Sequence, residues 1–357
     1  MNNFIYQNTT KVYFGKGGVK EYLCCLLKKV GDTVMLAYGG GSIKKNGIYD
    51  EVTAILQKAG KTVVDFSGIM PNPTYAKVQE GAKLVRENNV DFILAVGGGS
   101  VIDCCKIVSA QAKLSEDIWD METVKRNYPS DFVPMGAIVT ASGTGSEMNN
   151  GAVITNEEKK IKCGLMGAQA QFVFLDPSYT MSVPFKQVIS GAFDTLSHAM
   201  ETYFGKPNDN NLSDDINEAV MRSVIRNIRI LLKDKENYEA RSELMWASSM
   251  AENGILKIGK ITDFQCHQIE HQLGAYTDCN HGQGLAVIHP VLYRHIYKDG
   301  AERFARFAKN VWGVKEKKST EETALAGVEA LAAFIKEIGL PKSFTQMGIS
   351  ADLVLFF

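Results

Sequence analysis

The sequence lacks the features that mark several large classes of protein. Its 357 residues carry 39 lysines and arginines against 40 aspartates and glutamates, so no excess charge indicates a nucleic-acid or membrane-surface binder. The start, MNNFIYQNTTKVYFG, has no basic segment followed by a long apolar run, and no transmembrane segment is apparent. We therefore expect a cytoplasmic protein whose partner is a small molecule.

Cysteines are too few and too poorly spaced for a disulfide framework. The seven cysteines form no CxxC pair, and four of them are vicinal, Cys24 with Cys25 and Cys104 with Cys105. Such spacings, in a chain of this length, indicate reduced thiols in an intracellular protein.

The pattern of apolar segments predicts two domains. Up to Pro184, apolar runs such as TVMLAY, DFILAV, MGAIVT and FVFLD alternate with helix-length segments, which predicts βαβ units and a parallel sheet covered on both faces. After the first glycine run, a helix of about fifteen residues that ends at Gly60 is expected. Beyond Pro184 the pattern is helical only, with helices expected at 187–204, 213–233, 238–257, 263–275, 284–297, 301–311 and 320–338. We predict an α/β domain over residues 1–184 and an all-helical domain over residues 185–357.

Two glycine runs each join an expected strand to an expected helix. They are Gly39, Gly40, Gly41 and Ser42, and Gly97, Gly98, Gly99 and Ser100. Backbone N–H groups at such a turn can hold a phosphate, and two turns predict a dinucleotide; the alternative for either alone is a plain tight turn. Neither run fits the spacing G-x-G-x-x-G, because Lys44 and Ile102 occupy the third glycine position.

Neighbouring residues favour NADP over NAD. Asp103 lies on the first turn after the second glycine run, where a nicotinamide amide could be held, and TASGTGSE at 140–147 forms a third loop of small donors. The first run carries no acidic residue for a ribose 2′-hydroxyl. It offers Ser42, Lys44 and Lys45 instead, which suit a 2′-phosphate.

Histidines gather near the middle of the helical half. Four of the six lie at 267, 271, 281 and 289, and His267 and His271 are one helical turn apart. Asp194 and His198 repeat that spacing on another apolar helix. Each pair alone has a plain alternative, a cavity-lining or surface polar pair. Together with His281 they predict a mixed nitrogen and oxygen metal site, suited to Fe(II) or Zn(II).

Several motifs together resemble one known family, the iron-dependent (group III) alcohol dehydrogenases, in their NADPH-dependent butanol dehydrogenase-like branch. The motifs are YGGGSIKKNG (38–47), MPNPT (70–74), GGGSVIDCCK (97–106), TASGTGSEMN (140–149), DTLSHAMETY (194–203) and HQIEHQLGAYTDCNHGQGLAVIHP (267–290). The resemblance implies the dehydroquinate synthase-like fold, a homodimer, and a cofactor and metal that meet in the cleft between the domains. Relatives usually continue past GISADLVLFF, where this sequence stops.

The resemblance also implies roles for individual residues. Metal ligands would be Asp194, His198, His267 and His281, and His271 matches an active-site histidine that is not a ligand. Gly97, Gly98, Gly99 and Ser100 would contact the pyrophosphate, with Asp103 towards the nicotinamide. Further cofactor contacts would be Asn72, Thr140, Ser142, Thr144, Val153 and Lys162.

The expected activity is reversible hydride transfer between NADP(H) and a primary alcohol or aldehyde such as butanol or butanal, with a metal acting on the substrate oxygen. His271 is the expected proton carrier, because a free imidazole has a pKa near neutrality. Two alternatives remain open. One is a metal- and dinucleotide-dependent lyase of the dehydroquinate synthase type, and the other is a catalytically silent cofactor-binding protein.

Overall fold

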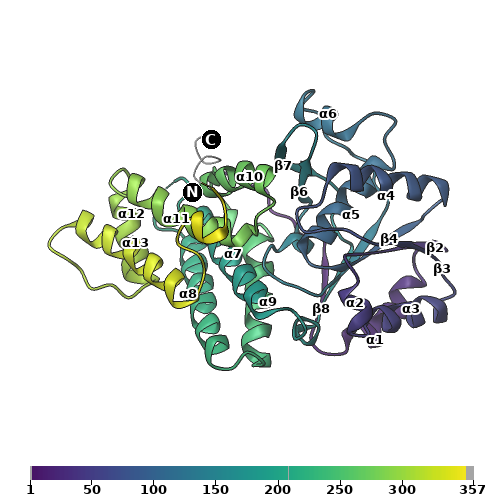
Figure 1. Cartoon of the computed structure of the whole chain (residues 1–357), viewed down its shortest axis with the longest axis horizontal. Helices are drawn as coiled ribbons and strands as arrows, with labels where there is room; N and C mark the ends of the chain where they lie inside the picture. Colours follow the sequence, from purple (N-terminus) through teal and green to yellow (C-terminus); the bar gives the residue numbers. More distant parts are fainter. Residues whose placement is uncertain (1, 208, 351–357) are drawn as a thin grey trace. The chain divides into compact units, whose positions relative to one another are not determined.

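A computed structural model describes residues 2–207 and 209–350 of the chain (Figure 1). The chain divides into two compact units by its internal contacts. One is Asn8–Val183, and the other comprises the described residues of 1–7 and of 184–357. The first unit holds the sheets and the second is helical.

Six parallel strands form the main sheet of the first unit. Their order is β1-β8-β5-β4-β2-β3. The strands are β1 (Lys11–Phe14), β2 (Thr33–Tyr38), β3 (Thr62–Phe66), β4 (Phe92–Gly97), β5 (Met135–Val139) and β8 (Phe172–Leu175). The predicted parallel sheet is confirmed, and the apolar runs are its central strands, buried because both faces are covered.

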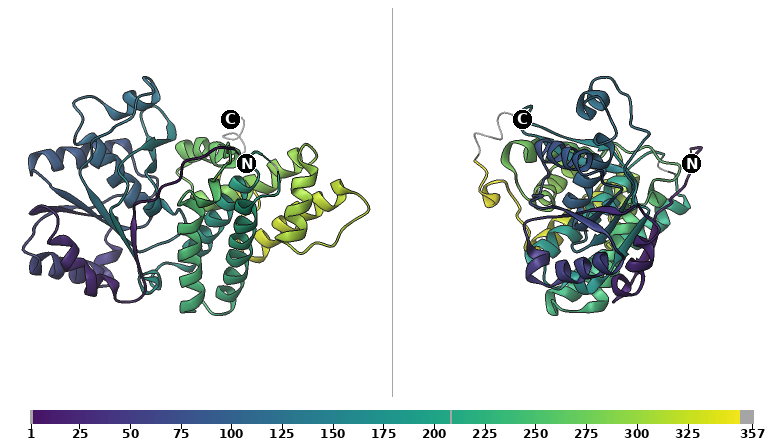
Figure 2. Two further views of the ribbon diagram at one scale, coloured as in Figure 1. Left: turned by 180° about the vertical axis from the view of Figure 1, so that it is seen from behind. Right: turned by 90° about the vertical axis from the view of Figure 1, so that its right-hand side faces the viewer.

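Helices cover both faces of this sheet. On one face α1 (Gly18–Leu27), α2 (Ser42–Lys45) and α3 (Ile48–Lys58) pack their apolar residues against β2, β4 and β8. On the other lie α4 (Tyr75–Glu87) and α5 (Gly99–Gln111), as Figures 1 and 2 show. The other helical elements of this unit are the short helix α6 (Ile118–Thr123) and the 3₁₀ turns η1 (Ser146–Met148) and η2 (Pro177–Thr180).

Two details of this unit differ from the prediction. The helix expected to end at Gly60 corresponds to α3, but the short helix α2 before it was not predicted. Helix α2 ends at Lys45, and Gly47 adopts φ 81° before α3 begins. This left-handed conformation, which glycine adopts without strain, separates the two helices. An antiparallel hairpin of β6 (Gly151–Asn156) and β7 (Ile161–Met166) was not predicted at all.

The strand order brings the three predicted cofactor loops to one edge of the sheet. The chain passes from β2 to β3 on one side and then returns to β4 on the other side of β2. Tyr38 pairs with Val96 and Gly97 pairs with Val139, so the loops that follow β2, β4 and β5 leave neighbouring strand ends. In open α/β sheets ligands bind at such a reversal of strand order, outside the carboxyl ends of the strands.

The second unit is a bundle of helices. They are α7 (Phe185–Tyr203), α8 (Leu212–Lys233), α9 (Tyr238–Glu252), α10 (Gln265–Thr277), α11 (His281–Ile296), α12 (Ala301–Asn310) and α13 (Thr320–Glu337), with 3₁₀ turns η3 (Ile255–Lys257) and η4 (Thr345–Met347). Each expected helix is present. Helix α7 is buried along most of its length, since the other helices surround it.

Side-chain caps fix where several of these helices begin. Asn211, Asn237, Asn280 and Ser319 precede α8, α9, α11 and α13, and each accepts a hydrogen bond from a backbone N–H of the first turn. The cap at Asn280 starts α11 at His281, three residues before the predicted start at 284.

None of the helices in the described part of the chain is both long enough and apolar enough to span a membrane.

Glu122 gives the first unit a specific dependence on pH. Its buried Oε2 accepts the N–H of Met166 at 2.8 Å, while Oε1 is buried without a hydrogen-bond partner among the described residues. Burial raises the pKa of this carboxyl to about 7, although the Met166 amide opposes the shift. In the unfolded chain the Glu122 carboxyl has a pKa of about 4.3, so the folded unit binds its proton more tightly than the unfolded chain does. The folded unit therefore loses stability as the pH rises from about 4.3 to about 7.

We predict that Glu122→Gln removes this loss, because the amide stays neutral at every pH. The variant should gain about 3 kcal/mol of unfolding free energy relative to the unchanged protein between pH 4 and pH 8, measured by urea titration. An equal dependence on pH in both proteins would contradict the buried, ionising carboxyl.

Candidate metal and cofactor site

Three helices supply the side chains of the predicted metal site. On α7, Asp194 and His198 lie one turn apart and face the same way. On α10, His267 and His271 do the same. His281 is the first residue of α11, where the Asn280 cap fixes the direction of the chain.

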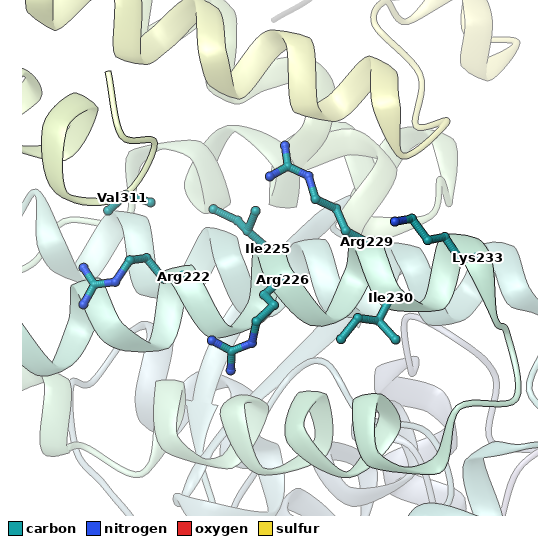
Figure 3. Close-up of a pocket in the computed structure, with 7 residues that line it drawn as sticks. All are labelled: Arg222, Ile225, Arg226, Arg229, Ile230, Lys233 and Val311. Carbon is teal, nitrogen blue, oxygen red and sulfur yellow. The ribbon is translucent and has the colours of Figure 1, made fainter. Parts of the chain in front are cut away.

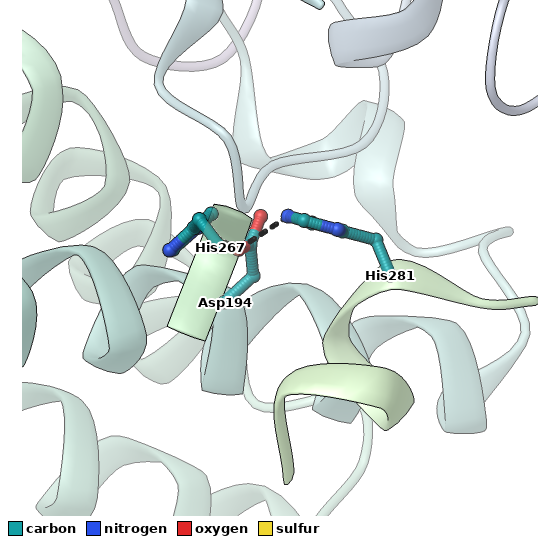
Figure 4. Close-up of side chains that lie close together, drawn as sticks. All are labelled: Asp194, His267 and His281. Atoms are coloured by element: carbon teal, nitrogen blue, oxygen red, sulfur yellow. Dashed lines mark ion pairs between the residues drawn. The ribbon is translucent and has the colours of Figure 1, made fainter. Parts of the chain in front are cut away.

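The ligand atoms of these residues converge on one oxygen. Asp194 Oδ1 lies 3.5 Å from His281 Nε2, 3.6 Å from His267 Nε2 and 3.7 Å from His198 Nε2. Asp194, His267 and His281 each place a ligand atom within 4.8 Å of the other two (Figure 4). His198 stacks on His267 with ring centroids 4.6 Å apart, at the side of this group.

The spacing fits a bound metal ion. Ligand atoms about 2.1 Å from a metal in a tetrahedral shell lie about 3.4 Å apart, close to the three distances from Asp194. At such separations no hydrogen bond forms between them. Asp194 Oδ1 and His267 Nε2 are indeed buried with no hydrogen-bond partner among the described residues. A cation between them would satisfy both atoms, and the nitrogen and oxygen donor set suits Fe(II) or Zn(II).

The charges of the group also favour a cation. Burial by itself would raise the pKa of Asp194, but the imidazoles of His198, His281 and His267 outweigh it and hold that pKa well below its usual range. Burial lowers the pKa of His198, which keeps this imidazole neutral. For His267 burial acts in the same direction, but the neighbouring carboxylates of Asp194 and Glu201 outweigh it and raise its pKa to about 9. A metal ion would take the place of that proton.

The other two histidines of the segment lie in different surroundings. His271 is buried beside the group, with its ring centroid 5.9 Å from that of His281. His289 lies behind it, where Ser197 Oγ is 2.6 Å from Nε2 and Cys266 Sγ is 3.2 Å from Nδ1. Burial lowers the pKa of His289 to about 4, so this imidazole is neutral and supports the packing.

Sequence reasoning missed two carboxylates that contact the ligands. Glu201 bonds to Nδ1 of His267 and Glu270 bonds to Nδ1 of His281. A signal was present, since Glu201 lies seven residues after Asp194 and Glu270 three after His267. Both spacings place the carboxylate on the ligand face of its helix.

The two predicted glycine turns have different surroundings. A Cβ added at Gly40 or Gly41 would meet nothing within 4 Å, so the backbone there is open to a ligand. A Cβ at Gly97 would lie 2.5 Å from Val101, and one at Gly99 would lie 2.3 Å from Thr144 Oγ1. The second turn therefore needs glycine so that α5 and the loop after β5 can approach closely.

Asp103 joins the second turn to the hairpin. Its carboxylate accepts the hydroxyl of Ser146 and, at 2.9 Å, the N–H of Val153. Lys106, a fully buried residue that the prediction did not include, donates to Asn149 Oδ1 at 3.0 Å and to Gly151 O at 2.6 Å. Asp103 and Lys106, one turn apart on α5, together hold the loop between β5 and β6.

The remaining predicted cofactor residues surround the same edge of the sheet. Thr140, Ser142 and Thr144 belong to the loop after β5, and Asn72 adopts φ 51° in the loop after β3. Lys162 is buried on β7, paired with Thr155 of β6.

Lys44 lies over two aromatic rings near the first turn. Its Nζ is 5.0 Å from the ring centroid of Tyr38 and 4.5 Å from that of Tyr49. Tyr49 donates its hydroxyl to Asp65 at 2.8 Å. Asp65, on β3, is an acidic residue that the argument for NADP overlooked, because it follows the first turn by more than twenty residues.

A cavity of about 390 Å³ lies elsewhere in the helical unit, along α8 (Figure 3). It is lined by Arg222, Ile225, Arg226, Arg229, Ile230, Lys233 and Val311, none of which is a predicted site residue. Arg229 forms a two-pronged ion pair with Glu337, and Arg222 donates to Asn310 O. Glu337 thus neutralises the charge of Arg229, and the Arg222 guanidinium already has a hydrogen-bond acceptor.

Helix α11 packs so closely against α7 at Gly282 that we predict no larger residue is tolerated there without loss of stability. A Cβ at this position would lie 2.3 Å from the carbonyl oxygen of Ser190, so Gly282→Ala must push α11 away from α7. We expect a loss of about 1–3 kcal/mol of unfolding free energy, measured by denaturant titration, together with lower metal content because His281 adjoins the clash. Gly300→Ala, whose Cβ would lie 3.6 Å from the Phe304 ring, is the control. Equal effects of both changes would contradict the close approach.

Comparison with known proteins identifies the family. Residues 9–177 match the family described as iron-containing alcohol dehydrogenase, and residues 188–354 match the C-terminal part of the Fe-containing alcohol dehydrogenase family. NADH-dependent butanol dehydrogenase A of Clostridium acetobutylicum is 40% identical over 355 residues, which cover 99% of this chain and 91% of that protein. NADPH-dependent aldehyde reductase YqhD of Escherichia coli is 35% identical over 361 residues, or 99% of this chain and 91% of that protein.

A solved structure agrees with these matches. The crystal structure of NADH-dependent butanol dehydrogenase A from Thermotoga maritima superposes with a TM-score of 0.94 at 36% identity, covering 99% of this chain and 88% of that one. The resemblance seen in the motifs is thereby confirmed, and the chain belongs to the iron-containing alcohol dehydrogenase family.

Proposed function

We propose that the protein is an oxidoreductase that transfers hydride reversibly between NADP(H) and a primary alcohol or aldehyde of the butanol and butanal type. The proposed metal is Fe(II), with Zn(II) as the alternative. The proposed ligands are Asp194, His198, His267 and His281. Names of similar proteins, a butanol dehydrogenase and an aldehyde reductase, support the substrate class.

One observation carries the proposal. The buried Asp194 Oδ1 faces three imidazole Nε2 atoms at 3.5–3.7 Å, a distance too long for hydrogen bonds and suited to a shared metal ion. Because Asp194 Oδ1 has no hydrogen-bond partner among the described residues, the site is costly to the fold unless a cation fills it.

When bound, the metal supplies a Lewis acid for the substrate oxygen and the nicotinamide supplies or accepts the hydride. The residues of the chain do the rest. Three neutral imidazoles and one carboxylate hold the cation, and the buried surroundings keep their positions fixed. His271, one turn from His267 and beside His281, is proposed to pass the hydroxyl proton of the substrate to solvent.

The cofactor residues are proposed in three groups, which lie on the loops after the strands, on helices α2 and α5 and on the β6–β7 hairpin. Gly39, Gly40, Gly41, Ser42 and Lys44 would hold the adenosine end, and Gly97, Gly98, Gly99 and Ser100 the pyrophosphate. Asn72, Asp103, Thr140, Ser142, Thr144, Val153 and Lys162 would surround the remainder. The open backbone at Gly40 and Gly41 and the N-terminus of α5 at Gly99 support these roles.

NADP(H) is the proposed cofactor because Ser42 and Lys44 are exposed at the first turn and suit a 2′-phosphate. The similar NADPH-dependent aldehyde reductase supports this choice, whereas the similar butanol dehydrogenases use NADH by name. A homodimer is also proposed. Strand β1 lies at an edge of the sheet and leaves Phe14 half exposed, which suits pairing with a second copy.

The function is tested by following the absorbance of NADPH with butanal. Protein purified without air is reconstituted with Fe(II) or with Zn(II) and compared with metal-free protein. Oxidation of NADPH that requires metal is the expected result. No net oxidation with any short aldehyde, despite bound metal and cofactor, would contradict a dehydrogenase and agree with a lyase or a silent binding protein.

If His271 carries the proton, its loss should lower the rate of the reaction without lowering the metal content of the protein. His271→Ala should keep its metal and lose about 100-fold in kcat, since a positioned acid–base group contributes about that much. By contrast, His267→Ala should lose metal and activity together. Metal content is measured by elemental analysis beside the kinetics, with His295→Ala on the exposed face of α11 as control. Loss of metal from His271→Ala would rule out the proton-carrier role.

The role of Lys44 predicts a change in cofactor preference. Lys44→Ala should raise KM for NADPH about tenfold and leave KM for NADH unchanged, because one charge-assisted contact to the 2′-phosphate is lost. Steady-state kinetics with both cofactors measure this, and Lys58→Ala at the end of α3 is the control. A parallel rise for both cofactors would show that Lys44 does not read the 2′-phosphate.

A further inference from the structure

Two of the proposed ligand histidines are each bonded to a buried carboxylate on the side away from Asp194. His267 offers Nε2 to the metal position and bonds through Nδ1 to Glu201 Oε2. His281 does the same with Glu270 Oε2. Both glutamates are buried, with exposed fractions of 5% and 0%. A buried carboxylate destabilises the fold unless it is paired and hydrogen-bonded, and each histidine provides such a partner.

We propose that Glu201 and Glu270 are positioning residues of the metal site. Each carboxylate accepts the Nδ1–H of one histidine, which fixes the tautomer whose Nε2 lone pair points towards Asp194. This proposal rests on the proposed metal-dependent function. It adds two anionic groups that neither contact the substrate nor bind the metal themselves.

Glu201 is held in place by the start of helix α10. Its Oε1 accepts the backbone N–H of Cys266 at 2.7 Å, and its Oε2 accepts that of His267 at 3.2 Å. These amides belong to the first turn of α10, where backbone N–H groups have no partner within the helix. Glu201, which lies on α7, therefore fixes both the start of α10 and the ring of its ligand.

Glu270 has a comparable support in the next helix. A Cβ at Gly284 would lie 2.9 Å from Glu270 Cγ, so only glycine lets α11 approach this side chain so closely. The Cys279 thiol lies 3.9 Å from its Oε1. Glu270 thus holds the ring of His281 at the first residue of α11, while the Asn280 cap holds the backbone there.

The two contacts link the three helices in sequence. A carboxylate of α7 orients the histidine of α10, and a carboxylate of α10 orients the histidine of α11. Histidine ligands commonly donate their other ring N–H to such a partner, and losing the partner typically lowers metal affinity 10- to 100-fold. Two further negative charges beside the ligands also favour a divalent cation.

The geometry predicts that Glu201→Gln and Glu270→Gln have different effects on metal affinity. Both oxygens of Glu201 accept N–H groups, so in Glu201→Gln the amide NH₂ must face a donor, and we expect metal affinity to fall 10- to 100-fold. In Glu270→Gln the amide oxygen can still accept from His281 while its NH₂ turns towards Cys279. This variant should stay within about threefold of the unchanged protein, whereas Glu270→Ala should lose 10- to 100-fold.

The experiment measures Zn(II) affinity of the full chain by competition with a chromophoric chelator. Glu218→Gln is the matched control, a buried carboxylate of the same unit that is bonded to Tyr203 and Arg306. It should bind Zn(II) as tightly as the unchanged protein. Far-ultraviolet circular dichroism and thermal unfolding of each metal-free variant establish that it is folded.

A measurement on the unchanged protein avoids any failure of a variant to fold. ¹⁵N NMR of histidine-labelled protein with bound Zn(II) reports which ring nitrogen carries the proton. We expect Nδ1–H and metal-bound Nε2 at both His267 and His281. Metal on Nδ1 of either would overturn the proposal, as would unchanged affinity in folded Glu201→Gln and Glu270→Ala. If the unchanged protein itself binds no Zn(II) or Fe(II), the proposed function fails instead.

Discussion

A buried carboxylate facing three imidazoles is the constraint on which the helical unit depends. Asp194 is buried on α7. Its Oδ1 lies 3.5–3.7 Å from the Nε2 atoms of His198, His267 and His281, which is close to the distance between two ligands of one metal ion. Without a cation this arrangement leaves buried polar atoms unpaired, which costs stability. Metal binding and the packing of α7, α10 and α11 are therefore expected to support each other, as in other proteins whose metal contributes to folding.

The α/β unit has a comparable constraint in its strand order. Strand β3 is added on one side of β2 and strand β4 on the other, so the order of the strands reverses at β2. The loops after β2, β4 and β5 therefore meet at one edge of the sheet. Glycine is required where these loops and α5 approach each other, as at Gly99 against Thr144, while Gly40 stays open. The contacts of Asp103 and Lys106 then stiffen the loop between β5 and β6. A rigid edge of this kind suits a cofactor that must be held in one orientation.

Much of the fold could be predicted from periodicity and composition. The apolar strands and the amphipathic helices of both halves were found because each has a clear period. The short helix α2 before Gly47 was missed, since its four residues are too few to show a helical period. The β6–β7 hairpin was missed because its turn, Asn156 to Lys160, is polar and resembles an open loop. Spacing alone brought Asp194, His198, His267 and His271 under consideration. Helical spacing places Glu201 and Glu270 on the ligand faces of their helices, but each bonds to a histidine of another helix, and spacing within one helix does not identify that partner. Asp65 was missed because it lies on the next strand, far along the sequence from the first glycine turn.

X-ray absorption at the metal edge tests the central claim most directly. On protein reconstituted with Fe(II) or Zn(II), the account predicts a shell of nitrogen and oxygen atoms only, at about 2.0–2.2 Å, with the multiple-scattering pattern of several imidazoles. A sulfur neighbour near about 2.3 Å would place Cys266 or Cys279 in the shell. That result, or a shell without imidazole, would contradict a site built from Asp194, His198, His267 and His281.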